Sequence, residues 1–163
     1  MDTTHMVRHF LAALAYRFQK AVRDAPEGFT SFNAGYGIRP PVDIIWHMNG
    51  VLGFARNILA SGDEGYNHVR QQDWQKQIKL FHKTLQEIDL LLSQQSYEAK
   101  LLERLLQGPL ADAMTHVVQL ALIRRIAGAP VWGENFFAAD IKIGNLGEHQ
   151  PEPADPDEGQ QYP

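Results

Sequence analysis

Apolar residues repeat with the period of an α-helix along most of this chain. The clearest stretch runs from Trp74 to Leu92, where they follow one another in steps of 4, 3, 4, 3 and 4. Its members are Trp74, Ile78, Phe81, Leu85, Ile88 and Leu92. This spacing gathers them on one face of a helix, whereas a strand requires strict alternation. We therefore expect an all-α fold.

Two earlier stretches show the same period. The first runs from Val7 to Val22 and is ended by the Pro- and Gly-containing segment 24–28. The second begins near Pro40-Pro41, where a proline suits a first helical turn because its missing N–H needs no partner there. Gly50 and Gly53 lie inside this second helix. We expect them to permit close approach of a neighbouring helix.

The second half of the chain predicts a short helix and then a long one. The segment 93–96 ends the Trp74 helix, and a short helix follows over 97–107. Gly108-Pro109 is interpreted as punctuation, after which the long helix spans 109–127. Gly128 and then Pro130 end it in the order that is usual for a helix C-terminus.

Three segments do not predict helices. Residues 28–40 form a long Gly-rich connection, and residues 131–146 are apolar without a period, which indicates an extended strap on the helices. Residues 147–163 form a tail with four prolines and five acids. We thus expect one domain over 1–146, a four-helix bundle with a long first connection, a short extra helix and a C-terminal strap, followed by the acidic Pro-rich tail.

The composition narrows the function classes. The chain has no cysteine, which excludes disulfides, thiolate metal sites and a cysteine nucleophile. Residues 1–146 carry 14 acids and 15 Lys or Arg, so the body is near neutral and offers no electrostatic footprint for nucleic acid. No apolar run reaches the length of a membrane span, and the N-terminus lacks a signal-peptide pattern. We expect a cytoplasmic protein with neither a nucleic-acid nor a membrane partner.

Two of the seven histidines lie on the apolar faces of their helices. His47 shares a face with Ile44 and Val51, and His116 with Leu120. The other histidines fall on termini, loops or stripe edges and are predicted to be solvated: His5, His9, His68, His82 and His149. Asp112 precedes His116 by one turn, so the two side chains project together.

Two imidazoles and one carboxylate that converge inside a bundle can hold a divalent metal. Zn²⁺, Ni²⁺, Fe²⁺ and Mn²⁺ all accept such ligands. Three protein ligands leave positions open, which is the pattern of catalytic sites, where a coordinated water or thiol is deprotonated near neutral pH. The alternative is that His47 and His116 are hydrogen-bonded core residues and that Asp112 is a first-turn acid favoured by the helix dipole.

Two further residues near this trio have two readings each. Asp43 lies one turn before His47 and could accept a hydrogen bond from its ring, or could simply be a first-turn acid. Arg124 could bind an anionic group of a substrate or close the C-terminus of its helix. No phosphate-binding glycine motif and no nucleophile elbow is present.

The segments Pro41–Met48 (PVDIIWHM) and Gly108–Arg125 (GPLADAMTHVVQLALIRR) together resemble the DinB-like superfamily, the damage-inducible, YfiT-like metalloprotein bundles. The resemblance covers about residues 5–146, and its most specific part is the run His-x-x-Gln-Leu-x-x-x-Arg with Gln119 and Arg124. It implies a four-helix bundle with a buried metal, commonly nickel or zinc. The ligands would be one histidine on the second helix and an H-x-x-x-H pair on the fourth. His47 and His116 match this pattern, whereas Asp112 replaces the first histidine of the pair, which favours harder metals such as manganese or iron somewhat.

The function hypothesis is a metal-dependent hydrolase or a thiol-dependent transferase. Its small-molecule substrate would meet a metal held by His47, Asp112 and His116, and any low-molecular-weight thiol must arrive as a cosubstrate because the chain has no cysteine. The 28–40 connection would roof this site or simply pack on the bundle end, with three aromatics as candidates for its lining: Phe29, Phe32 and Tyr36. The alternative is a non-catalytic helical bundle that acts through association, as a homodimer or with a partner, and in which the polar trio is a structural network.

Overall fold

The structure of the chain is a computed structural model. It describes residues 3–65, residue 70 and residues 72–156. The chain is all-helical over these residues, and no strand occurs among them. The α-helices are α1 (Thr3–Val22), α2 (Pro41–Ser61), α3 (Trp74–Gln94), α4 (Ala99–Leu105) and α5 (Ala111–Ile126). A 3₁₀ turn, η1 (Phe29–Ser31), and a π-helical turn, η2 (Leu106–Leu110), complete the elements. The expected all-α class is confirmed.

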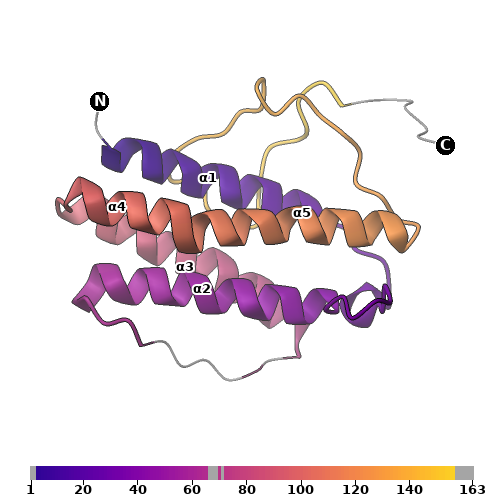
Figure 1. Ribbon diagram of the computed structural model, residues 1–163. Helices are drawn as coiled ribbons and strands as arrows, with labels where there is room; N and C mark the ends of the chain where they lie inside the picture. Colours follow the sequence, from indigo (N-terminus) through magenta and orange to yellow (C-terminus); the bar gives the residue numbers. More distant parts are fainter. Residues whose placement is uncertain (1–2, 66–69, 71, 157–163) are drawn as a thin grey trace.

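The four long helices lie side by side. Helix α5 contacts α1 and α2, and α3 contacts the same two helices (Figure 1). The connection between α1 and α2 lies at one end of the molecule, and the chain after α5 passes back over α1. The helix periods in the sequence therefore identified the elements and their approximate bounds.

The core forms where the predicted stripes meet. All the apolar residues expected on one face of α1 are buried, and Phe18 of that face stacks on Phe81 of α3 with ring centroids 3.7 Å apart. Residues fully withdrawn from water in this way supply most of the stability of a helical domain. The stripe predicted for α1 is confirmed, and so is that of α3 except at Trp74, which is half-buried against the core.

The stripe predicted for α2 is partly wrong. Val51, Phe54 and Ile58 are only half-buried, whereas Ile45 and Leu52 lie in the core. The buried face of α2 is thus rotated from the predicted one, and His47 lies at its edge. The sequence misled here because α2 is apolar on two faces, and periodicity cannot say which face meets the neighbours.

The prediction that Gly108-Pro109 interrupts the helix is also wrong. Helices α4 and α5 join through the π-helical turn η2, in which the N–H of Ala111 bonds to the carbonyl of Leu106. Pro109 has no N–H and its ring crowds the carbonyl four residues earlier, so a wider turn accommodates it without ending the helix. Figure 1 shows α4 and α5 as one continuous rod.

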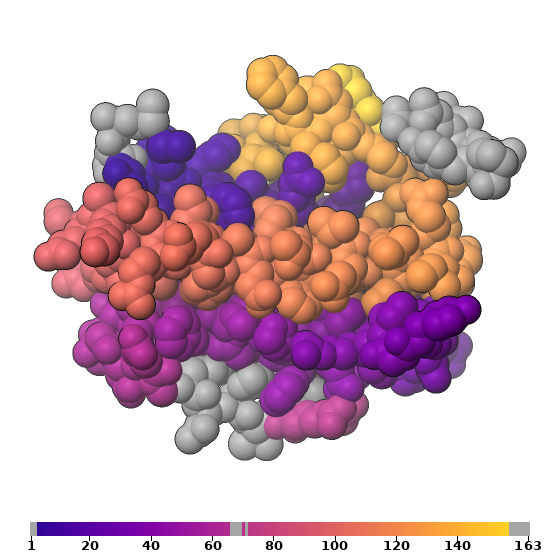
Figure 2. Space-filling view, viewed as in Figure 1, coloured from indigo at the N-terminus to yellow at the C-terminus, as the bar shows by residue number. Residues whose placement is uncertain are grey.

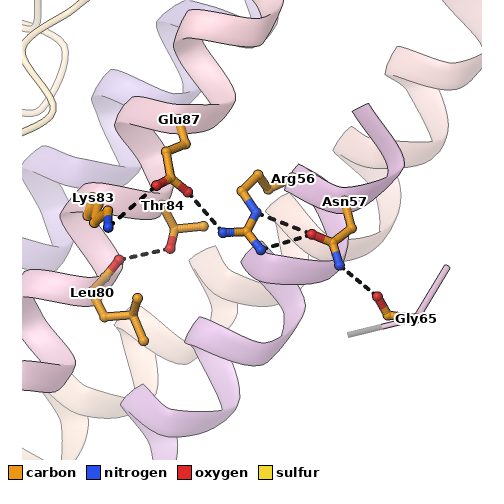
Figure 3. A network of polar contacts seen from close by, with 7 residues as sticks. All are labelled: Arg56, Asn57, Gly65, Leu80, Lys83, Thr84 and Glu87. Atoms are coloured by element: carbon orange, nitrogen blue, oxygen red, sulfur yellow. Dashed lines mark hydrogen bonds and ion pairs between the residues drawn. The ribbon is translucent and has the colours of Figure 1, made fainter. Parts of the chain in front are cut away.

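Polar side chains also join α2 to α3. Arg56 on α2 donates from Nη1 to Oε2 of Glu87 on α3 over 3.0 Å, and Lys83 lies 3.8 Å from the other carboxylate oxygen (Figure 3). On the other side of Arg56, Asn57 donates to the carbonyl of Gly65 over 2.7 Å. The network ties the start of the α2–α3 connection to the helix pair.

The segment after α5 packs on the helices as an irregular strap, as expected. Leu146 is buried, and its carbonyl accepts a 2.7 Å hydrogen bond from Nδ1 of His82. Further along the helices, Glu134 has a fully buried side chain that accepts from the hydroxyl of Tyr16 over 3.0 Å and pairs with Lys20 at 3.1 Å. Burial, followed by this bond to Glu134, raises the pKa of Tyr16 to about 12. The strap is thus fastened to α1 and α3 by polar contacts as well as by packing.

The prediction that His82 is solvated is wrong. His82 is only 3% exposed, and besides the Leu146 carbonyl it meets the side-chain amide of Gln19 at 3.1 Å. Burial lowers the pKa of His82 below its usual value. His5, His9 and His149 are exposed as expected, and His68 lies outside the described residues.

No helix that the structure describes combines the length and the apolarity that a bilayer crossing requires.

Candidate metal centre

The structure brings His47, Asp112 and His116 together. Nε2 of His47 on α2 lies 3.0 Å from Oδ2 of Asp112 on α5, and the two imidazole rings have centroids 4.7 Å apart. One ligand atom from each residue can be chosen so that all lie within 4.8 Å of one another. Three side chains that are far apart in sequence therefore converge across one helix pair.

The local helix explains the orientation of His116. Its Nδ1 lies 2.8 Å from the main-chain carbonyl of Asp112, to which it donates, and this leaves Nε2 free to accept a proton or bind a metal. Metal-binding histidines usually donate their second ring nitrogen in this way. His116 is also almost buried, so its ring is fixed by packing.

The donor set fits a divalent cation. Nitrogen and oxygen ligands about 2.1 Å from a tetrahedral metal lie roughly 3.4 Å apart, close to the separation of His47 and Asp112. Two neutral imidazoles and one carboxylate would carry a single negative charge. Divalent ions of the zinc and nickel type accept this mixture, and the carboxylate also suits manganese or iron. The same 3.0 Å contact is equally a histidine–carboxylate hydrogen bond of ordinary length.

An open cleft of about 730 Å³ lies beside the trio. His47 and Asp112 line it from one side, and the half-buried Trp46, Val51 and Phe54 of α2 supply apolar walls. This volume lies in the range of small-molecule sites. Two of the three potential metal ligands, His47 and Asp112, therefore face a space that can admit a substrate.

Two glycines widen this cleft. Gly50 lines it one turn after Trp46, and Gly108 lines it from the π-helical turn, where an added Cβ would meet no atom within 4 Å. Gly53, by contrast, is buried among the helices. The expectation of close helix approach thus stays a prediction for Gly53, whereas Gly50 lines the cleft next to His47.

The other candidate residues lie away from the trio. Asp43 accepts hydrogen bonds from Arg70 and Gln72. Within the described part of the chain, no hydrogen bond joins it to the ring of His47. Gln119 is exposed on α5. Tyr36 is fully exposed and does not line the cleft. The placement of Asp43 in the first turn of α2 agrees with the dipole reading.

Arg124 is occupied by main-chain carbonyls. It is 6% exposed and donates to the carbonyls of Ala129, Ala21, Arg23 and Asp24. These contacts close the C-terminus of α5 and hold the end of α1, which is the second of the two predicted readings. Burial lowers the pKa of Arg124, and the charge of Asp24 opposes this effect.

The aromatics of the 28–40 connection pack on the helix ends. Phe29 is buried and meets Trp74 edge to face with centroids 5.9 Å apart, and Phe32 is packed against the core. Neither lines the cleft beside His47. The expectation that this connection roofs the site is therefore wrong, and the alternative reading as packing is the one observed.

Sequence reasoning missed most of the cleft lining. Trp46, Phe54, Glu64 and Gln107 face it, yet none was a candidate. The spacing of Val51 and Phe54 from His47 was a usable signal, because residues four and seven positions on share its face. Glu64 carries no such signal, since it comes from a connection.

Comparison of the chain with protein-family models, with curated proteins and with solved structures gives no match. The DinB-like resemblance of the sequence motifs therefore stays a prediction, and the candidate site stands on its own geometry.

Proposed function

We propose that this protein is a metal-dependent enzyme on a DinB-like four-helix bundle, with one divalent ion held by His47, Asp112 and His116. The observation that carries the proposal is the convergence of these three donors, within 4.8 Å of one another, with His47 and Asp112 in the wall of an open cleft. A structural network would need the contact but not the adjoining space. Zinc or nickel is the first choice of metal, and manganese or iron the second.

The chemistry follows from the donor set. A bound divalent ion would supply a Lewis-acidic centre that lowers the pKa of a coordinated water or thiol. His116 is held in the required tautomer by the Asp112 carbonyl, and the half-buried His47 stands on the cleft side. The reaction class is hydrolysis or transfer to an external low-molecular-weight thiol, in a cytoplasmic setting.

The cleft also restricts the substrate. Among its described lining residues, Asp112 and Glu64 are acids and none is Lys or Arg. The walls are aromatic and aliphatic, with Trp46 and Phe54 the largest side chains. We expect a substrate with an apolar body and no anionic group away from the metal, because such a group would meet no Lys or Arg in the described lining.

The test is metal content by mass spectrometry on protein purified without an affinity tag, beside His116→Ala. Near one equivalent of metal in the wild type, lost in the variant, would support the proposal. His149→Ala is the matched control, since that histidine is exposed and far from the trio in sequence. Less than about a tenth of an equivalent after incubation with zinc, nickel or manganese would rule the metal enzyme out. A site with the affinity usual for protein-bound metal would keep its ion through purification.

A second candidate function is association of two copies without catalysis. Val118, Leu122 and Ile126 follow one another at single-turn spacing on α5 and are 61%, 55% and 49% exposed. An apolar stripe of this kind on a helix commonly serves as an interface. Sedimentation should then show a dimer for the wild type and a monomer for Leu122→Glu, because the added charge disrupts the apolar contact. Metal content separates the two functions, because a hydrogen-bonded network ignores chelators.

A further inference from the structure

A second cleft of about 650 Å³ lies between α1 and the strap. One wall comes from the C-terminal half of α1, with Tyr16 and Lys20, and from the turn after it, with Arg23 and Asp24. The other wall comes from strap segments 130–133 and 150–156. Figure 2 shows the strap, in orange to yellow, rising above the indigo α1. No residue that lines this cleft also lines the cleft beside His47. It is therefore separate from the candidate metal centre.

The strap wall is mostly apolar. Trp132 is 57% exposed although it lines a cleft, and proline rings and Val131 surround the same space. A half-exposed indole beside proline rings offers a face on which another ring can lie. This wall favours a planar aromatic body over a flexible chain.

Arg124 adds positive charge to the cleft, and the charge of Asp24, which lines the same cleft, acts against it. Arg124 lines the cleft, and its hydrogen bonds within the described part of the chain all go to main-chain carbonyls. Carbonyls satisfy the guanidinium N–H groups but leave the charge in place. Arg23 and Arg124 outnumber Asp24, the acid among the described lining residues, so an anion in the cleft would still be favoured.

Arg23 offers the direct contact for such an anion. Its Nη2 donates to the carbonyl of Gln150, while Nη1 lies 3.5 Å from Oε1 of Glu152. The Glu152 side chain is 89% exposed, so this ion pair is weak and easily exchanged. A ligand carboxylate could replace Glu152 at one edge of the guanidinium. Lys20 is not available in the same way, because it pairs with the buried Glu134.

The geometry points to a binding site for a small aromatic carboxylate in this cleft, with its ring on Trp132 and its carboxylate on Arg23. The site does not depend on the metal centre. It would serve as a substrate or effector site that shares no lining residue with the cleft beside His47.

The test is calorimetric titration of the full chain with indole-3-acetate, with indole-3-ethanol as the neutral analogue and acetate as the anion without a ring. We expect one equivalent of indole-3-acetate to bind, about tenfold more tightly than the alcohol, since a charge-assisted contact of ordinary strength corresponds to that factor. Acetate alone should bind too weakly to saturate.

Two variants assign the contacts. Arg23→Gln should remove the advantage of the acid over the alcohol, and Trp132→Ala should weaken both ligands. Arg104→Gln on α4 and Phe137→Ala in the strap are matched controls, because both residues are exposed and neither lines the cleft. Circular dichroism of each variant checks that the helices are intact.

Three results would overturn the site. The first is the absence of saturable binding of indole-3-acetate at millimolar concentration. The second is binding that Arg23→Gln and Trp132→Ala leave unchanged. The third is binding that His116→Ala abolishes, which would place the ligand at the metal centre instead. Retention of binding in His116→Ala with loss in Arg23→Gln supports the site whether or not the chain holds a metal.

Discussion

His116 donates from Nδ1 to the main-chain carbonyl of Asp112, 2.8 Å away, while the carboxylate of the same Asp112 lies 3.0 Å from Nε2 of His47. One residue therefore has two separate functions at the centre. Its backbone fixes the ring of His116, and its side chain faces His47. A substitution at position 112 can change the second without disturbing the first.

This separation predicts the behaviour of two variants at position 112. Asp112→Ala should lower zinc affinity by about 100-fold, because one of three ligands is lost while the backbone bond to His116 remains. Asp112→His should keep or raise the affinity for zinc and nickel, since imidazole suits both ions. Competition with a chromophoric chelator measures both affinities.

Asp140→Ala is the control for these variants, because Asp140 is an exposed strap acid outside the trio. Equal zinc affinity in Asp112→Ala and wild type would show that the carboxylate is not a ligand. Loss of affinity in Asp112→His as well would show that the space beside His47 cannot accommodate a third imidazole.

The helices and the three residues of the candidate metal centre could be predicted because both depend on local periodicity. The stripe of α1 emerged buried, and His116 could be placed on the face of Leu120 by counting turns. His82 could not be placed, because its burial depends on Leu146, which meets it only after the strap crosses α1 and α3. The roof expected from the 28–40 connection failed for a related reason, since loop direction is set by tertiary packing rather than by spacing.

His82 predicts a pH dependence of stability. Its pKa is lowered in the folded protein, chiefly by burial, with the Leu146 carbonyl and the charge of Glu148 acting in the opposite sense. As the pH is lowered past the ordinary pKa of about 6.5, the unfolded chain therefore binds more protons than the folded one. The free energy of unfolding consequently decreases as the pH is lowered. Urea denaturation at several pH values between about 7 and 5 measures this slope.

His82→Gln should flatten that slope, because glutamine can still meet the Leu146 carbonyl but does not titrate. His9→Gln is the matched control, since His9 is exposed on α1. If His82→Gln retains the full slope, other groups are responsible for the acid sensitivity.

The contacts of Glu134 are expected to hold the strap on α1 and to stabilise the fold. Its side chain is fully buried and joins Lys20 and Tyr16. Glu134→Gln should lower the free energy of unfolding by about 2–4 kcal/mol, because the ammonium of Lys20 loses its carboxylate in a mostly dry site. Tyr16→Phe should lower it by about 1.5–3 kcal/mol, the usual contribution of a hydrogen bond to a charged group. Equilibrium unfolding in urea gives both values.

Glu152→Gln provides the comparison, because Glu152 is an almost fully exposed strap acid whose loss should change stability little. The double variant Lys20→Met with Glu134→Leu should recover much of the stability lost in Glu134→Gln, since replacing both partners leaves no uncompensated charge. A double variant less stable than Glu134→Gln would show that the charges themselves hold the strap.

We expect a substitution at Pro109 to raise the stability of the fold and to lower the affinity for the metal. It lies in the π-helical turn directly before α5, and Gly108 beside it lines the cleft. Pro109→Ala would supply an N–H for the carbonyl of Leu105 and relieve the ring clash, so the free energy of unfolding should rise by about 1–3 kcal/mol. If the turn then tightens to an α-turn, α5 rotates relative to α4, and Asp112 and His116 leave their positions opposite His47. Zinc affinity should fall by about tenfold or more.

Thermal unfolding of the metal-free protein and chelator competition measure the two effects separately, and Pro130→Ala, outside the helix, is the control. A gain in both stability and affinity would show that the π-helical turn does not position the site.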